Sequence, residues 1–333
     1  MKKIIALALV LLMASFALTG CGAAKVKTGL AVVSSIARSS DAAADAEGTA
    51  EADSVVAAVT VDGSGKIVAC KLDTAQSTAG LTADGKISTP LDTEFKTKQE
   101  KGADYGMKAA SGIGKEWNEQ ADALCKYVVG KTIDQVKGIA VNEEGAPTDA
   151  ELSSSVTVSI GDYVAAIAKA VENAKELGAT ATDKLGLGIT TNIAKSTEPT
   201  ADAEGNVQFY SYYTVSTFDK DGKITSCIID ASQTNVGFDA TGKITTDLAS
   251  AFKTKNELGA DYGMKASSGI GKEWFEQADA FAKYVTGKKV ADVSGISLTE
   301  GAPASGTELA SSVTVHVTDM ISVVEKALAS SAK

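Results

Sequence analysis

The chain of 333 residues contains a single histidine, His316, and only four cysteines. His316 lies in the second of two similar halves, and the first half has Ser159 at the corresponding position. A metal-binding or catalytic role shared by both halves therefore cannot depend on histidine. Because no His/Cys cluster has ligand spacing, we expect no zinc or iron site. No base and nucleophile recur in both halves, which argues against a hydrolase, and we predict no catalytic residue.

Aromatic and basic residues are also scarce. Phenylalanine, tryptophan and tyrosine make up 5% of the chain, which is too few for a large sugar-stacking surface. The 42 acidic residues outnumber the 32 lysines and arginines, and the formal net charge is −10. Such a chain repels phosphate backbones, so nucleic acid is not expected as a partner.

The cysteines do not form an even set. Beyond Cys21 there remain Cys70, Cys125 and Cys227, and an odd number in an exported protein argues against a full disulfide framework. Cys70 and Cys227 occupy equivalent points of the two halves, each in an apolar run. We expect buried free thiols, while one pairing that involves Cys125 stays open.

The N-terminus has the layout of a secretory signal. Lys2 and Lys3 precede an apolar run over residues 4–18, and Leu-Thr-Gly-Cys ends at Cys21. The run is shorter than the ~20 residues that a spanning helix needs. We interpret residues 1–20 as a signal peptide. The Leu-Thr-Gly-Cys motif over residues 18–21 resembles a lipobox, which implies diacylglycerol on Cys21. We therefore expect a lipoprotein anchored at the extracytoplasmic face of the cell membrane.

The rest of the chain is a tandem duplication with an offset of 157 residues. Such a long period indicates two domains rather than a solenoid, and each copy is large enough for its own core. Whether the two copies touch is left open by the sequence. The predicted segments are a tether (21–28), repeat domain 1 (29–173), a linker (174–184) and repeat domain 2 (185–333).

Similarity between the copies is uneven. Between residues 95–127 and 252–284, 27 of 33 positions are identical. Between residues 29–60 and 186–217, only 12 of 32 are identical. A recent duplication alone would leave both regions equally similar.

Each copy reads as strands followed by helices. In the first copy, runs rich in β-formers over 54–61 and 66–73 flank an Asp-Gly turn, which is typical of a hairpin. Apolar residues then recur at helical spacing from Trp117 to Val128 and again from Val164 to Val171. We predict an α+β fold: two tandem copies of an antiparallel β-sheet, a meander, packed by helices.

The most similar stretch is glycine-rich and leads into a helix: GADYGMKAASGIGKEW over 102–117 and GADYGMKASSGIGKEW over 259–274. It is not a P-loop, because Ala109 and Glu116 stand where that motif needs Gly and Ser or Thr. Two interpretations stay open. Either the glycines supply turns and the aromatic residues pack the loop to the sheet, or the loop contacts an anionic ligand. The candidate contacts are Gly106, Gly112, Gly114 and Lys115, with Gly263, Gly269, Gly271 and Lys272.

A second candidate site precedes the last helix of each copy. The segment Glu-Leu-Ser-Ser-Ser-Val-Thr over 151–157 has its counterpart over 308–314, and each ends in a threonine. A hydroxyl close to a helix N-terminus would favour a phosphate group. Thr157 and Thr314 are thus the predicted attachment or phosphate points.

The strand motif V-x-V-D-x-x-G-K-I occurs over residues 59–67. Together with the threonine motif, it resembles the FMN-binding domain of exported flavoproteins and ion-pumping membrane reductases. That family closes on D-x-x-S-G-A-T, whose threonine takes FMN through a phosphoester bond. Here Glu151 stands for the Asp and Thr157 for the threonine, but Ser155 and Val156 replace Gly and Ala. The whole repeat also resembles uncharacterised lipoproteins of Gram-positive anaerobes. FMN is the cofactor that the resemblance implies.

Two functions therefore stay in view. The expectation is a noncatalytic binding or surface lipoprotein, whose ligand is a flavin or another small molecule. The alternative is an electron-transfer protein that carries flavin in two FMN-binding-like domains and relays electrons outside the membrane.

Overall fold

The computed structural model describes residues 23–332, so the expected signal peptide and Cys21 lie outside the described residues. Two similar units follow one another, each with a three-stranded antiparallel sheet and several helices. The strands of each sheet are neighbours in chain order, which confirms the predicted α+β fold with a meander sheet. Among residues 23–332, no helix has the length and apolar character needed to cross a membrane.

The strands are longer than the sequence pattern predicted. Beta-formers mark 54–61 and 66–73, yet pairing runs from Gly48 in one strand to Leu81 in the next. The additional part contains alanines that are fully buried but carry no strand signal, such as Ala50 and Ala79. The strands of the two three-stranded sheets are β1 (Lys27–Ser35), β2 (Gly48–Val61), β3 (Ile67–Leu81), β4 (Lys184–Asn192), β5 (Gly205–Phe218) and β6 (Ile224–Phe238).

The helices cover the outer side of each sheet. The main ones are α2 (Trp117–Val128) and α5 (Gly161–Glu172) in the first repeat, with α7 (Trp274–Val285) and α9 (Thr318–Ser331) in the second. The apolar face predicted for α2 is confirmed, because its residues are all buried: Trp117, Ala121, Leu124 and Val128. Shorter elements are α1 (Lys98–Lys101), η1 (Gly102–Tyr105), α3 (Ile133–Lys137), α4 (Ala150–Ser153), α6 (Lys255–Leu258), η2 (Gly259–Tyr262), α8 (Val290–Ser294), β7 (Leu298–Thr299), β8 (Ala302–Pro303) and η3 (Leu309–Ser311).

Helix α5 buries only part of the face expected from Val164, Ile167 and Val171, because the two valines pack at the edge of the core. Val164 and Val171 are only half-buried, whereas Ala166, Ile167 and Ala170 are buried. Small residues are needed there because α5 lies very close to β1. A Cβ on Gly29 would come within 1.9 Å of the Ala170 carbonyl oxygen. The face is therefore set by how near the helix approaches the strand.

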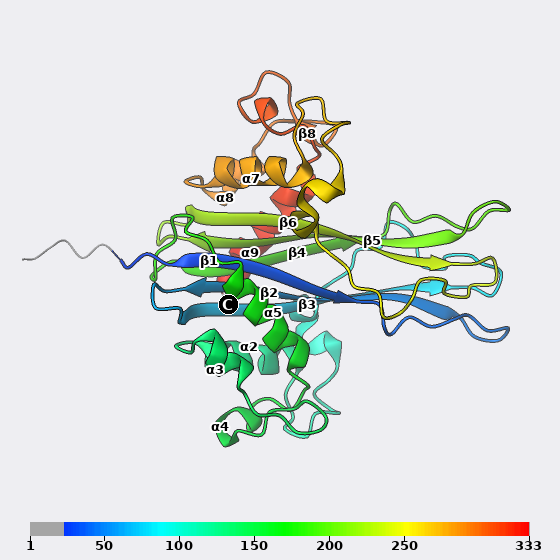
Figure 1. Ribbon diagram of the computed structural model, residues 1–333, viewed down its shortest axis with the longest axis horizontal. Coiled ribbons are helices and arrows are strands. Elements are labelled where there is room, and N and C mark those ends of the chain that lie inside the picture. Colours follow the sequence, from blue (N-terminus) through cyan, green and yellow to red (C-terminus); the bar gives the residue numbers. More distant parts are fainter. Residues whose placement is uncertain (1–22, 333) are drawn as a thin grey trace, which may run out of the picture.

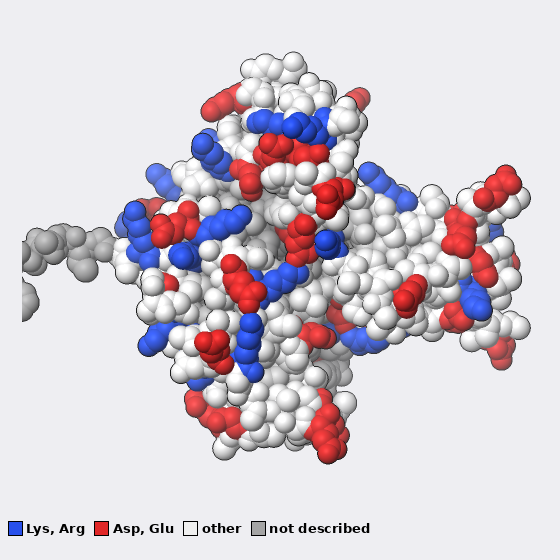
Figure 2. All heavy atoms as spheres, in the orientation of Figure 1, with Lys and Arg blue, Asp and Glu red and all other residues white. Residues whose placement is uncertain are grey.

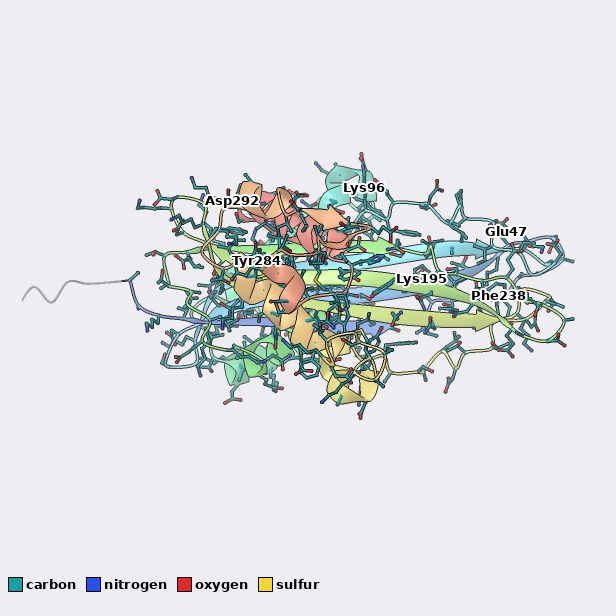
Figure 3. All side chains as sticks on the ribbon, turned by 90° about the horizontal axis from the view of Figure 1, so that it is seen from above. Glu47, Lys96, Lys195, Phe238, Tyr284 and Asp292 are labelled. Carbon is teal, nitrogen blue, oxygen red and sulfur yellow. The ribbon has the colours of Figure 1, made fainter. Side chains whose placement is uncertain are left out.

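The two sheets pack against each other in the middle of the molecule, with helices on both outer sides (Figure 1). Each repeat has a core of its own between its sheet and its helices. Two further apolar clusters join the inner faces of both sheets. The view in Figure 3 shows the strands continuing beyond the helices, with Phe238 at that end. The repeats are thus two units of one molecule rather than separate bodies on a linker.

Large residues of one repeat meet small residues of the other between the sheets. Tyr213 and Phe209 of β5 are fully buried there, and the first repeat has Val56 and Ala52 at the corresponding positions. Phe238 likewise corresponds to Leu81. The less similar of the two regions compared above therefore includes strands where the copies meet, and the need to fill that interface is consistent with the drift there.

Reciprocal contacts also cross between the repeats. Lys326 of α9 pairs with Glu100 of α1 at 2.7 Å, and the equivalent Lys169 of α5 pairs with Glu257 of α6. The linker is engaged as well, because Lys175 exchanges backbone hydrogen bonds with Thr28 of β1. The repeats are therefore arranged like the subunits of a twofold dimer, joined in one chain.

Replacing Phe209 by Ala, the residue of the sister repeat, should leave a void between the sheets. We expect the free energy of unfolding to fall by about 3–5 kcal/mol, the usual cost of removing a buried phenylalanine ring. The matched control is Phe275→Asn, which also copies the sister residue, Asn118, but at a half-buried position outside the sheets. Urea unfolding of both variants measures the difference. Equal losses would contradict this account of the interface.

Candidate functional site

The glycine-rich loop already holds an anion supplied by the protein. The Glu116 carboxylate, 7% exposed, accepts hydrogen bonds from the backbone amides of Met107 and Lys108 at 2.9 and 3.1 Å. Glu273 does the same with Met264 and Lys265 at 2.9 and 3.0 Å. These four amides are therefore engaged by buried carboxylates, which would also repel an incoming phosphate.

The loop and the threonine segment, predicted as separate sites, lie side by side. The Gln120 amide nitrogen donates to the Ser111 hydroxyl at 3.1 Å and to the Lys115 carbonyl at 3.3 Å. Its carbonyl oxygen accepts from the backbone amide of Thr157 at 2.8 Å and from the Thr157 hydroxyl at 3.3 Å. Gln120 is fully buried and thus fastens the two segments to α2.

The second repeat repeats this arrangement with Gln277. Its side chain joins Ser268 and the Lys272 carbonyl to Thr314, with a 2.8 Å bond from the Thr314 backbone amide. Sequence reasoning missed both glutamines. The available signal was the identical Glu-Gln-Ala-Asp within the most similar stretch of the two copies.

The predicted site residues are reachable from solvent but lie outside the two described cavities. Thr157 and Thr314 are exposed, as are the candidate glycines, while Lys115 and Lys272 are half-buried. Neither cavity described below is lined by any of them. Gly106 and Gly114 have φ of 77° and 63°, as the structural interpretation of the loop requires, whereas Gly112 does not have a positive φ. The two cavities and the predicted threonine sites are thus separate places in the molecule.

A buried lysine lies under each glycine-rich loop. In the second repeat, the Lys255 ammonium lies 4.6, 4.5 and 4.9 Å from the ring centres of Tyr210, Tyr262 and Trp274. Burial lowers the pKa of Lys255 to about 7. Its counterpart Lys98 lies above the rings of Tyr105 and Trp117. These contacts pack the loop to the sheet, and they account for the aromatic residues that the two copies share.

A buried aspartate ties the start of α1 to the sheet. Asp73 of β3 accepts hydrogen bonds from the backbone amides of Thr74 at 2.7 Å and Gln99 at 3.0 Å. Burial raises the pKa of Asp73 to about 7, even though the hydrogen bonds oppose the shift. Asp230 has the same pair of contacts, with Ala231 and Asn256, and burial raises its pKa to about 7 as well.

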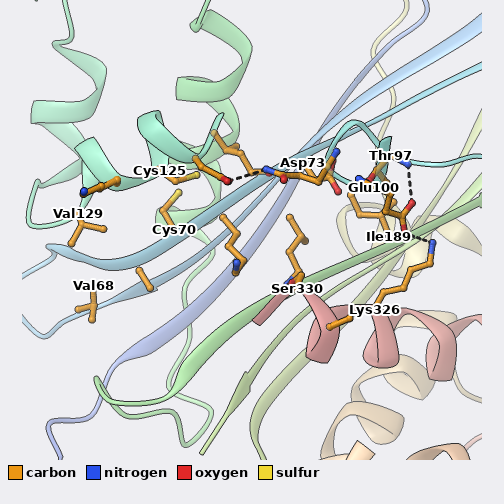
Figure 4. Close-up of a pocket in the computed structure, with 18 residues that line it drawn as sticks. Val68, Cys70, Asp73, Thr97, Glu100, Cys125, Val129, Ile189, Lys326 and Ser330 are labelled. Carbon is orange, nitrogen blue, oxygen red and sulfur yellow. Dashed lines mark hydrogen bonds and ion pairs between the residues drawn. The ribbon is translucent and has the colours of Figure 1, made fainter. Parts of the chain in front are cut away.

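A cavity of about 450 Å³ lies between the two repeats next to Asp73. Its walls come from β3, α1 and α2 of the first repeat and from β4 and α9 of the second. Leu72, Leu187 and Ile189 contribute apolar surface, and Figure 4 shows Lys326 reaching Glu100 across the opening. This volume is in the range of small-molecule sites, which commonly lie between domains.

The equivalent place in the second repeat holds another cavity with a different lining. Cys227, Ile228 and Asn256 correspond to Cys70, Lys71 and Gln99 of the first cavity. Lys175 and Leu177 of the linker line only the second cavity. The chain connection thus makes the two cavities unequal.

Charge on the surface is mixed. On the face drawn in Figure 2, lysine and arginine side chains lie among aspartates and glutamates. Among the described residues that line the first cavity, the acidic Asp73, Glu100 and Asp122 are balanced by three lysines. Charge alone therefore favours neither an anionic nor a cationic ligand there.

Comparison with known proteins finds one short similarity. No family model matches the chain, and no solved structure matches it. A stretch of 42 residues is 52% identical to the chlorophenol reductase of Desulfitobacterium hafniense. The match covers 13% of this chain and 13% of that protein. The resemblance to FMN-binding domains therefore stays a prediction.

The Asp73 carboxyl predicts a pH dependence of stability. Its pKa is 3.8 in the unfolded chain and about 7 in the folded one, so the folded state binds the proton more tightly. The resulting stabilisation is complete below pH 3.8 and is lost as the pH rises through 7. Asp73→Asn keeps an acceptor oxygen without the buried charge. We expect its advantage over the wild type to grow by about 1–3 kcal/mol between pH 5 and pH 8.

Urea unfolding of both proteins across this range provides the measurement. Because Lys255 titrates in the same range, the difference between variant and wild type is the informative quantity. A constant difference across the range would show that Asp73 remains ionised in the folded protein.

Proposed function

We propose that the protein is a lipoprotein, anchored through Cys21 at the extracytoplasmic face of the membrane, which binds a small molecule without transforming it. The supporting observation is the cavity of about 450 Å³ between the repeats. Apolar walls with a few converging polar groups are typical of ligand sites. The absence from the sequence of a base and nucleophile shared by both repeats favours binding over catalysis.

The lining of the cavity defines the class of ligand. Leu72, Leu187 and Ile189 favour an apolar body, because burying apolar surface supplies most of the binding free energy. Gln99 and Asp73 add polar groups, and the lining also contains Glu100, Asp122 and three lysines. The Gln99 side chain donates to the Leu72 carbonyl and to Asp122 at 3.2 and 2.9 Å, so its position is fixed. We infer an amphipathic molecule, with an apolar body and with polar groups that face the polar part of the lining.

Binding of the fluorescent probe 1-anilinonaphthalene-8-sulfonate tests this proposal. The wild type should bind it saturably at one site per chain. Ala329 of α9 is exposed at the rim of the cavity, and Ala329→Trp should close the opening and weaken binding at least about tenfold. Ala332→Trp places the same ring outside the cavity and should leave binding unchanged. Unsaturable binding, or equal binding by both variants, would argue against a ligand site between the repeats.

A flavin-carrying electron-transfer protein is the second candidate. The exposure of Thr157 and Thr314 favours it, since a transferase could reach both hydroxyls. The short similarity to a protein named a reductase agrees with a redox role. Neither of the two cavities described above lies at these threonines, so covalent attachment is the form of flavin binding to be tested.

Intact-mass measurement and a visible spectrum of the protein purified from its own host test this alternative. Covalent flavin predicts a mass excess of one or two FMN units, with each unit lost in Thr157→Ala or Thr314→Ala. The noncatalytic proposal predicts neither the mass excess nor the flavin absorption bands. A mass excess that persists in both variants would place the attachment elsewhere.

A further inference from the structure

Two thiols lie together on the wall of the cavity between the repeats. Cys70 belongs to β3 and Cys125 to α2, and both line this cavity. Figure 4 shows their side chains directed toward each other across the gap between strand and helix. Cys125 is 6% exposed, whereas Cys70 is partly exposed. One thiol of the pair is thus accessible and the other lies behind it.

The second repeat shows what this position looks like without a pair. Ala282 stands in place of Cys125, and the Cys227 thiol contacts the hydroxyls of Ser216 and Thr214 at 3.5 and 3.6 Å. The first repeat has Val59 and Ala57 where those hydroxyls lie. The strand cysteine therefore faces hydroxyls in one repeat and a second thiol in the other.

We propose that Cys70 and Cys125 form a disulfide that fastens α2 to β3 when the protein meets a low-molecular-weight disulfide. The Cys70 thiolate attacks one sulfur of the external disulfide, and the first small thiol leaves with a proton. Cys125 then attacks the Cys70 sulfur of the mixed disulfide, loses its proton to solvent, and releases the second small thiol. Two protein thiols are oxidised, and the external disulfide is reduced to two thiols.

The environments of the two sulfurs set this order. Cys70 is the partner that an external molecule can reach through the cavity. Burial and the adjoining Cys70 thiol raise the pKa of Cys125, so it stays protonated until the mixed disulfide brings an electrophilic sulfur against it. Among residues 23–332, no cluster of three or more metal-ligating side chains competes for the thiols. The inference does not depend on the proposed ligand.

Peptide mapping of the full-length protein in detergent tests the disulfide. The protein is treated with glutathione disulfide, quenched in acid, alkylated and digested with trypsin. We expect peptide 67–71 linked to peptide 116–126, and the link should disappear after reduction. Peptide 224–243, which contains Cys227, should remain alkylated. Separate peptides without a cross-link, or a cross-link to peptide 224–243, would overturn the proposal.

Matched variants separate a disulfide from general reactivity. Cys125→Ala copies the second repeat, so it should fold, and its Cys70 should retain glutathione as a trapped mixed disulfide. The wild type should not accumulate that species, because Cys125 resolves it. Oxidation should raise the Tm of the wild type and of Cys227→Ala by roughly 5 °C but leave Cys125→Ala unchanged. Persistent glutathione on wild-type Cys70 would show that the two sulfurs do not meet.

Discussion

The packing of one sheet on the other governs the rest of this molecule. Each sheet has an apolar inner face that its own helices do not cover, so burial of that face requires the other repeat. The aromatic side chains of β5 fill space that alanine and valine leave in β2. Because the two faces now differ in size, either repeat paired with a copy of itself would leave voids or clashes. Divergence has therefore made the repeats dependent on each other.

The glycine-rich stretch is explained largely by contacts within the protein. Glu116 binds the loop amides, Gln120 links the loop to the segment at Thr157, and the Lys98 ammonium lies over the ring of Tyr105. Each contact joins residues of the loop, the helix and the sheet that must match one another. A substitution at one of them leaves buried polar groups unpaired, so both copies keep the stretch. This favours the structural interpretation of the loop, while its exposed surface remains free for contacts.

Local patterns predicted the β2–β3 hairpin and the main helices, whereas β1, the short helices and the contacts between the repeats were not predicted. The turn at Asp62 and the apolar stripe of α2 follow from short-range rules, and both appear in the structure. The buried face of α5 was predicted only in part: Ile167 is buried as expected, but the buried Ala170 follows from the near approach of the helix at Gly29. The cavity could not be foreseen, since its walls come from residues more than a hundred positions apart. Asp73 was visible only as an identical position in both copies.

Joining two equivalent units by a peptide segment also has a geometric consequence. The linker leaves the first repeat beside the second of the two cavities, and its residues Lys175 and Leu177 line that cavity. No linker residue lines the cavity at Asp73, which is lined instead by residues of α9. Gene fusion can in this way turn a twofold assembly with two identical cavities into a single chain with two different cavities. Each cavity can then acquire different side chains, as the pair of thiols at Cys70 and Cys125 in the first cavity illustrates.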